Sequence, residues 1–330
     1  MRPTRWLAVC CLIALGGCQE SPGSAIAITT EELPAARVAL DYEASLACVD
    51  EAEEPIWEVV SGSLPPGVEL SVNGTLSGVP TRSGSYPFTV AADDGLGDDV
   101  VDLTLEIPPV TLISGFEPFG GYATNPSWDS LLPLDEELRA GMDIRIVELP
   151  VEWDVSWELL RDEIDRLSPT VALGTGMADS DAMRFEIRAQ NLENSTDNAG
   201  ETRWYEPVVE GAPDELSTDL PVEEMAAAME DGGYATTISS NAGTYLCNSI
   251  FFHLSHYEQL EGDDPPLTGF IHVPPAPYSG SFQVEDVTAA HELGLAALAA
   301  WLEGDRRAAA STPDSLTAPT YLDSLPAPAR

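Results

Sequence analysis

Residues 235–273 read ATTISSNAGTYLCNSIFFHLSHYEQLEGDDPPLTGFIHV and join two short apolar runs through one longer amphipathic segment. The runs at 235–239 and 268–273 predict strands, and the segment that begins near Thr244 predicts a helix. The same alternation recurs along the chain, with strands predicted at 110–114, 143–149 and 170–173 and helices near 128–138, 154–167, 222–231 and 287–302. Strands that alternate with amphipathic helices indicate an α/β layered sheet.

The chain upstream of residues 108–109, two prolines, follows a different pattern of short alternating runs separated by turn signals. The pair Asn73–Gly74 favours a two-residue hairpin, whose central positions both require positive φ, and Trp57 is a candidate core residue. Strands are predicted at 37–40, 56–60, 68–71, 75–77, 86–91 and 100–107. These features predict an all-β sandwich over residues 36–108 and a second domain over 109–305.

Three segments of the first domain resemble the immunoglobulin-like modules of bacterial surface proteins: SLPPGV at 63–68, GTLSGVP at 74–80 and GSY at 84–86. The resemblance covers most of the domain. Such modules serve as spacers, adhesins or substrate-positioning units, so the resemblance leaves the role of this domain open. A spacer is the simplest interpretation.

The charge of the chain is strongly unbalanced, with 56 acidic side chains against 14 basic ones and a formal net charge of −42. A surface of that sign repels phosphate backbones and anionic lipid head groups, so nucleic acid is excluded as a partner. The simplest interpretation of the acidic side chains is a well-solvated surface. No metal or organic cofactor is implied by the sequence.

The N-terminal segment has the pattern of a lipoprotein signal peptide over residues 1–17. Arg2 and Arg5 precede an apolar run at 6–15 that is too short to span a bilayer as a helix. The run closes with Leu-Gly-Gly-Cys at 15–18, which resembles the bacterial lipobox and implies cleavage before Cys18 and acylation of its thiol. An ordinary cleaved signal peptide is the alternative.

Lipid chains on Cys18 would anchor the protein to a membrane face. Gln19 follows, not the aspartate that retains such proteins at the inner membrane of Gram-negative bacteria, so we expect a place in the cell envelope, at the outer membrane if the source is Gram-negative. Residues 18–35 are rich in Ser, Pro, Gly and Glu and predict a linker. Residues 306–330 are rich in Ala, Pro, Ser and Thr and predict a disordered tail.

Two cysteines remain after removal of the signal peptide and acylation of Cys18, namely Cys48 and Cys247. In an oxidising compartment they could form one disulfide. We do not expect this pairing, because the two residues lie in different predicted domains.

Cys247 lies where a predicted strand passes through small polar residues into a predicted helix. A helix N-terminus lowers the pKa of a thiol and offers N–H groups to an oxyanion, so Cys247 is a candidate nucleophile. The alternative is a buried, inert thiol. His272 lies near the end of the strand predicted at 268–273, where ligands collect in α/β sheets, and it could take the thiol proton. For His272 the alternative is a hydrogen-bonded core histidine.

Several motifs, in order along residues 110–303, resemble those of the pyroglutamyl peptidase I family. They are SGFEPFGG at 114–121, NPSW at 125–128, DNAG at 197–200, LPV at 220–222, AGTYLCN at 242–248 and GFIHVP at 269–274. The resemblance implies a cofactor-free cysteine peptidase on a three-layer α/β/α sandwich. It also implies a peptide substrate with an N-terminal pyroglutamate, which the enzyme removes.

The resemblance assigns roles residue by residue. Cys247 matches the nucleophile of the family, His272 its base and Glu186 the carboxylate that orients the base. Phe116 and Phe119 match aromatic residues that enclose the lactam ring. Two further matches belong to the same substrate pocket, Tyr245 and Asn125.

Two positions depart from the family pattern: Ile187 stands in place of an arginine, and Thr175 in place of a pocket glutamine. They leave the catalytic set intact and bear on recognition of the lactam. We therefore expect an exported, lipid-anchored cysteine exopeptidase. The alternative is a catalytically inactive surface lipoprotein that binds peptides or adheres through its immunoglobulin-like domain.

Overall fold

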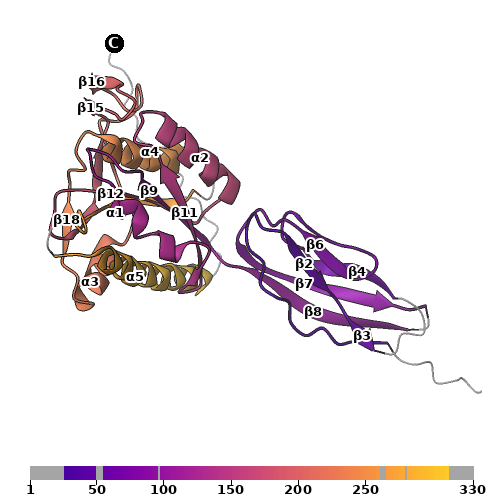
Figure 1. Cartoon of the computed structure of the whole chain (residues 1–330). Coiled ribbons are helices and arrows are strands. Elements are labelled where there is room, and N and C mark those ends of the chain that lie inside the picture. Colours follow the sequence, from indigo (N-terminus) through magenta and orange to yellow (C-terminus); the bar gives the residue numbers. More distant parts are fainter. Residues whose placement is uncertain (1–25, 50–54, 96, 261–264, 279–280, 312–330) are drawn as a thin grey trace, which may run out of the picture.

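The computed structural model describes residues 26–49, 55–95, 97–260, 265–278 and 281–311. Figure 1 shows two domains that meet at residues 108–109, an all-β domain followed by an α/β domain. The predicted signal peptide, the lipidation site Cys18 and the part of the predicted tail beyond Ser311 lie outside the described residues.

The first domain consists of two antiparallel three-stranded sheets and a short two-stranded one, with the strand orders β2-β6-β5, β4-β7-β8 and β1-β3. The bounds of its strands are β1 Ala27–Ile28, β2 Tyr42–Ser45, β3 Cys48–Val49, β4 Ile56–Gly62, β5 Val68–Leu70, β6 Thr75–Gly78, β7 Gly84–Asp93 and β8 Asp98–Ile107. Inward-facing residues of both larger sheets, among them Trp57, Leu76 and Leu105, are buried. The prediction of Trp57 as a core residue is confirmed.

Three local predictions for this domain are wrong. The segment 37–40 is a turn with Ala39 at φ +59°, so that its one fully buried residue, Val38, packs from a loop and not from a strand. Residues 26–35, assigned to the linker, begin with a strand, and the backbone N–H of Ile28 donates to Asp99 at 2.7 Å. In the hairpin between β5 and β6 only Gly74 has positive φ, because the loop spans residues 71–74.

The second domain alternates strands and helices as predicted. Its strands are β9 Val110–Phe116, β10 Leu138–Arg139, β11 Met142–Leu149, β12 Val171–Met177, β13 Met183–Glu186, β14 Arg188–Gln190, β15 Glu193–Thr196, β16 Thr202–Glu206, β17 Glu215–Ser217, β18 Thr236–Ser239 and β19 Leu267–Val273. Its helices are α1 Pro126–Asp129, α2 Val155–Leu167, α3 Val222–Asp231, α4 Leu246–Leu260 and α5 Val284–Ser311, with a 3-10 turn at Leu132–Leu134.

Seven strands form the central sheet in the order β10-β11-β9-β12-β19-β13-β18. Strands β11, β9, β12 and β19 are parallel, whereas β13 runs antiparallel to β19. Figure 1 shows α2 and α4 on one face of this sheet and α1, α3 and α5 on the other. Because β9 and β12 are buried along their whole length, they read as continuous apolar runs in the sequence.

The helix predicted near 128–138 is wrong. Asn125 starts α1, which ends after one turn, and a 3-10 turn containing Pro133 follows. The fully buried Leu131 and Leu134 produced the helical pattern, although they lie in an irregular segment. At the other end of the domain, α5 continues to Ser311, so the first residues assigned to a disordered tail belong to a helix.

An ion pair joins the two domains. The guanidinium of Arg37, from the first domain, binds the fully buried carboxylate of Asp143 on β11, with Nε 3.0 Å from Oδ2. Arg145 binds the same carboxylate and also donates to the backbone oxygen of Val38 at 3.5 Å. Burial of one carboxylate between two arginines ties the orientation of the first domain to the central sheet.

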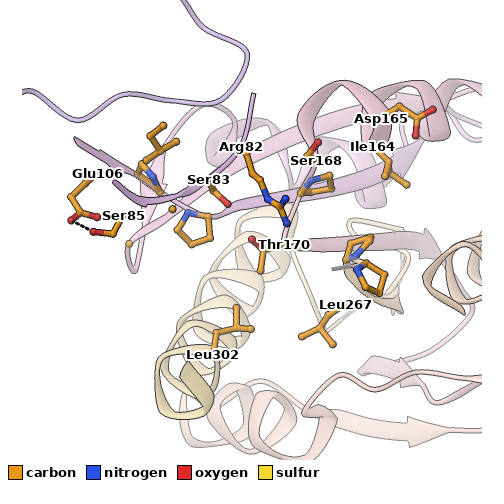
Figure 2. Close-up of a pocket in the computed structure, with 18 of the residues that line it drawn as sticks. Arg82, Ser83, Ser85, Glu106, Ile164, Asp165, Ser168, Thr170, Leu267 and Leu302 are labelled. Atoms are coloured by element: carbon orange, nitrogen blue, oxygen red, sulfur yellow. Dashed lines mark hydrogen bonds between the residues drawn. The ribbon is translucent and has the colours of Figure 1, made fainter. Parts of the chain in front are cut away.

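A groove of about 1300 Å³ lies between the two domains. Figure 2 shows residues that line it. Arg82, Ser85 and Glu106 line it from the first domain, where the Ser85 hydroxyl donates to Glu106 at 2.7 Å. Thr170 and Leu267 line it from the second domain, at the N-terminal ends of β12 and β19. The groove therefore lies at the edge of the sheet opposite to the one at which His272 is found. Within the described ranges, no helix has the length and apolar character needed to cross a membrane.

Candidate active site

Glu186 and His272 meet through the pairing of β13 with β19. In this antiparallel pair Glu186 lies opposite Phe270, two residues before His272, so that both side chains leave the same face of the sheet. Nδ1 of His272 lies 2.8 Å from Oε1 of Glu186, and both side chains are almost completely buried. The carboxylate accepts the Nδ1 proton, which leaves Nε2 of the imidazole as the basic nitrogen.

The carboxylate of Glu186 is held in its ionised form. Burial alone would raise its pKa, but hydrogen bonds and charges from His272, Ser239 and Arg184 outweigh burial and lower the pKa below its ordinary value. Oε2 is buried and has no hydrogen-bond partner of good geometry within the described part of the chain. Glu186 therefore presents a negative charge to the imidazole through one oxygen only.

Cys247 is the second residue of α4, which begins at Leu246, two residues after the start expected near Thr244. The sulfur lies against Gly176 of β12, where a Cβ atom would come within 2.6 Å of Sγ. Gly176 is paired with His272 across the parallel β12–β19 ladder. The absence of a side chain at position 176 thus leaves room for the thiol next to the strand that carries the histidine.

The N-terminal position of Cys247 in α4 does not lower the pKa of its thiol. Burial and, to a smaller extent, the negative charge of Glu186 together raise the pKa of Cys247 to about 12, although its own backbone N–H and Arg184 act in the opposite direction. The predicted lowering is therefore wrong for the thiol on its own. A thiol in this environment stays protonated until a base removes its proton, and the thiol is free of any disulfide to Cys48.

Asn248 fixes the start of α4, a role that we did not predict. Its side chain is fully buried and makes three hydrogen bonds to the backbone of residues 190–192: it accepts from the N–H of Gln190 at 2.8 Å and donates to the oxygens of Gln190 and Leu192 at 2.8 and 3.0 Å. The neighbour of the candidate nucleophile therefore anchors the helix to the segment after Glu186. In the sequence, the only signal for this role was an asparagine directly after the cysteine.

A narrow apolar pocket opens beside Cys247, lined by Phe116, Phe119, Val151, Met177, Tyr245, Leu246 and Cys247. Its free space is about 10 Å³, roughly enough for one water molecule. Phe119 and Tyr245 are half-buried, with ring centroids 6.3 Å apart, and are the side chains that must move to admit a ring. Burial raises the pKa of Tyr245 to about 12, so its hydroxyl stays neutral.

Asn125 does not line this pocket. It is the N-cap of α1: its Oδ1 accepts from the N–H and the hydroxyl of Ser127, and its Nδ2 donates to the backbone oxygen of Glu117 at 2.9 Å. These bonds give Asn125 a structural role in the loop that carries Phe119. A contact of Asn125 with a substrate stays a prediction.

The two departures from the family pattern also have structural roles. Thr175 is fully buried on β12, with its hydroxyl near the backbone oxygens of Ser114 and Ser127 at 2.8 and 2.9 Å. Ile187 follows Glu186 and packs against the apolar cluster on the side of α3 and α5. Neither side chain belongs to the set that lines the pocket.

Comparison with known proteins identifies the family of the α/β domain. A family model described as "Pyroglutamyl peptidase" matches residues 110–300, the whole of the α/β domain up to the second half of α5. The chain belongs to the pyroglutamyl peptidase family. As a member of that family it is a cysteine peptidase related to pyroglutamyl peptidase I. A second model, described as "Putative Ig domain", matches residues 41–107.

Relatives and solved structures of the pyroglutamyl peptidase family support this membership. A pyrrolidone-carboxylate peptidase from Chromobacterium violaceum is 34% identical over 194 residues, or 56% of this chain and 90% of the relative, and one from Streptomyces coelicolor is 37% identical over 206 residues. The pyrrolidone carboxyl peptidase of Thermococcus litoralis has a TM-score of 0.58 and 30% identity, covering 60% of this chain and 96% of that structure. Pyroglutamyl peptidase I of Bacillus amyloliquefaciens has a TM-score of 0.56 at 26% identity, with 58% and 97% covered.

Proposed function

We propose that the chain removes N-terminal pyroglutamate from peptides, with Cys247 as nucleophile, His272 as general base and Glu186 as the residue that orients His272. The observation that carries this proposal is the 2.8 Å contact between the buried Glu186 and His272. His272 lies on β19, opposite Gly176 of β12, the glycine that leaves room for the Cys247 sulfur. Each of the three residues comes from a different element, and only the fold brings them to one place.

In the acylation step Nε2 of His272 removes the thiol proton while Sγ attacks the pyroglutamyl carbonyl carbon. The raised pKa of Cys247 favours transfer of the proton during attack over a thiolate formed beforehand. The N–H groups in the first turn of α4 are placed to stabilise the developing oxyanion. Collapse of the tetrahedral adduct breaks the amide C–N bond, and His272 donates its proton to the departing amine.

In the deacylation step water attacks the thioester. His272 takes one proton from the water, the oxygen bonds to the carbonyl carbon, and the C–S bond breaks. The proton on His272 then returns to the sulfur, and free pyroglutamate leaves. The ionised Glu186, the neutral imidazole and the protonated thiol that begin the cycle are thereby restored.

The apolar pocket beside Cys247, once Phe119 and Tyr245 move apart, would hold the pyroglutamyl ring, which is compact and uncharged. Phe116 and Phe119 supply apolar surface to it. A free N-terminal ammonium would be buried among these side chains without a counter-charge, which is costly. The pocket therefore favours peptides blocked as the lactam over peptides with an unmodified terminus.

Activity on a fluorogenic pyroglutamyl amide tests the proposal. The wild-type protein should cleave this amide and leave the corresponding alanyl amide intact, and Cys247→Ala should abolish cleavage. Cys48→Ala, in the first domain, is the matched control and should retain activity. An inactive wild type that still binds the pyroglutamyl peptide would favour the alternative, a non-catalytic peptide-binding protein.

We also propose that the protein is exported and anchored in the cell envelope through lipid chains on Cys18, with an immunoglobulin-like sandwich as spacer. The lipobox-like residues 15–18 and the match of residues 41–107 to an Ig domain support this arrangement. Cys18→Ser should release the protein from the membrane fraction. If the variant stays membrane-bound after a carbonate wash, the anchor assignment is wrong.

A further inference from the structure

Arg184 contacts both members of the Glu186–His272 pair through polar atoms and does not belong to the proposed catalytic set. It lies on β13 directly opposite His272 in the antiparallel pairing with β19, and two residues before Glu186. Its side chain therefore leaves the same face of the sheet as the two buried residues. Neither the sequence motifs nor the pocket-lining residues include it.

The contacts of Arg184 are specific. Nε donates to Oε1 of Glu186 at 2.8 Å, which is the oxygen that also receives Nδ1 of His272. Nη2 of Arg184 lies 3.4 Å from Nδ1 of His272. One carboxylate oxygen is thus shared by a permanent cation and by the imidazole that has to accept a proton during the reaction.

We propose that Arg184 is a positioning residue that sets the pH range over which Cys247 and His272 react, by sharing the charge of Glu186 and placing a fixed positive charge beside the imidazole. The role rests on the proposed function of that site. It concerns the charge of Arg184 and not merely its shape, and this separates it from a structural contact.

The sign of the effect follows from electrostatics. A fixed cation disfavours a proton on the imidazole, and it favours the negative thiolate; Arg184 does act to lower the pKa of Cys247, against the effect of Glu186. The proton of the Cys247 thiol is therefore lost at a lower pH when the cation is present. The alkylation rate of Cys247 should accordingly rise at a lower pH in the wild type than in a variant without the cation.

Few other ionisable groups face this pair. Strand β13 contributes Arg184 and Glu186, β19 contributes His272, and α4 contributes Cys247. The adjacent strands β12 and β18, of sequence VALGTGM and TTIS, carry no ionisable side chain. Tyr245 precedes α4 and responds to Asp197, but its raised pKa keeps it neutral below about pH 12. Among the described elements around the Cys247–His272 pair, Arg184 is therefore the side chain that supplies a positive charge.

The test measures the rate at which iodoacetamide alkylates Cys247 from pH 5 to 11, with the peptide that contains Cys247 quantified by mass spectrometry in the full chain. This readout follows the thiolate and does not require peptide hydrolysis. In Arg184→Gln and Arg184→Met the rising part of the profile should move to higher pH by roughly one unit, since the side chain is partly exposed and its charge is screened. At a fixed pH on this rising part, alkylation should slow by roughly tenfold.

Arg184→Lys keeps the charge and should hold the profile within a few tenths of a unit of the wild type. Arg188→Gln is the matched control: Arg188 lies two residues beyond Glu186, binds Glu215 at 2.9 Å and the backbone of Ser240, and should leave the profile unchanged. The kcat/KM profile on the pyroglutamyl amide should shift with the alkylation profile.

Three results would overturn the role of Arg184: an unshifted profile in the neutral variants, the same shift in Arg184→Lys as in Arg184→Gln, or failure of both neutral variants to fold by circular dichroism. Failure of the proposed function looks different. In that case the wild type does not hydrolyse the amide at any pH, while the alkylation profiles still decide whether Arg184 controls the thiol.

Discussion

Glu186→Gln is the substitution that probes the proposed catalytic site most directly. Glutamine keeps the size and shape of the buried side chain and removes only its negative charge. In the proposed mechanism the wild-type carboxylate stabilises the imidazolium that forms when His272 takes the thiol proton, and it holds the Nδ1–H tautomer. A neutral amide can satisfy the hydrogen bond in only one orientation, and it cannot stabilise the charge.

The geometry sets the size of the loss. Two unit charges 2.8 Å apart, the distance from Nδ1 to Oε1, interact by about 6 kcal/mol at an effective dielectric constant of about 20. Arg184 donates to the same oxygen at 2.8 Å and offsets part of this energy. With about 3 to 4 kcal/mol remaining, kcat should fall by roughly 10²- to 10³-fold, and KM should change little, because Glu186 does not line the pocket.

The assay compares kcat and KM on the pyroglutamyl amide for the wild type, Glu186→Gln and His272→Ala, of which the last should lose most, because it removes the base itself. Glu193→Gln is the matched control. Glu193 is also a buried glutamate of this domain, but it binds Ser249 at 2.7 Å and Arg203 at 3.3 Å, away from the imidazole. A kcat for Glu186→Gln within threefold of the wild type, or an equal loss in Glu193→Gln, would refute the reasoning.

Three further predictions concern stability and domain structure. Asp143→Asn should lower the free energy of unfolding by about 2 to 3 kcal/mol, because it breaks a buried pair whose Arg37 partner is partly exposed. Glu163→Gln, in an exposed pair, should change the free energy of unfolding by less than about 1 kcal/mol. Urea unfolding followed by tryptophan fluorescence distinguishes the two effects. His291 is buried, neither ring nitrogen has a partner in the described part of the chain, and burial lowers its pKa to about 4 from 6.5. The stability that a neutral His291 allows is complete above about pH 6.5 and falls by about 3 kcal/mol as the pH falls towards 4. In urea titrations at several pH values, His291→Leu should make the free energy of unfolding depend less on pH. A fragment of residues 109–311 should fold and keep the activity of the full chain on the pyroglutamyl amide, since the first domain meets the sheet at the edge away from His272; loss of folding would show that the first domain completes the catalytic one.

The sequence predicted the elements whose burial leaves a clear pattern. Strands β9, β12 and β19 were found because they read as short, mostly apolar runs, and helix α2 because its apolar residues recur with the spacing of a helix. The helix near 128–138 was wrongly predicted from the same kind of pattern. Leu131 and Leu134 are spaced like residues of one helix face, but they lie in a 3-10 turn and the residue before it. Periodicity reports burial, and burial is not confined to regular elements.

The candidate site could be predicted in part. Cys247 and His272 each carried a local signal, and Glu186 came from a family motif. Arg184 carried none, because an isolated arginine in a short strand is placed opposite the histidine only by the antiparallel pairing of β13 with β19. The raised pKa of the Cys247 thiol was also out of reach, since the position at a helix start is visible in the sequence whereas the burial of the sulfur is not.

The Glu186–His272 pair and the Cys247 sulfur are held in place by different parts of the fold. Glu186 and His272 lie two residue pairs apart in the antiparallel pairing of β13 with β19, so their alignment is kept as long as the sheet is intact. The sulfur instead belongs to the first turn of α4, and this end of the helix is held by the three hydrogen bonds of Asn248 to residues 190–192. A displacement of that helix tip by an ångström or so would disconnect the nucleophile from its base while the sheet stays whole. The proposed reaction is therefore more sensitive than the fold to a small shift of α4.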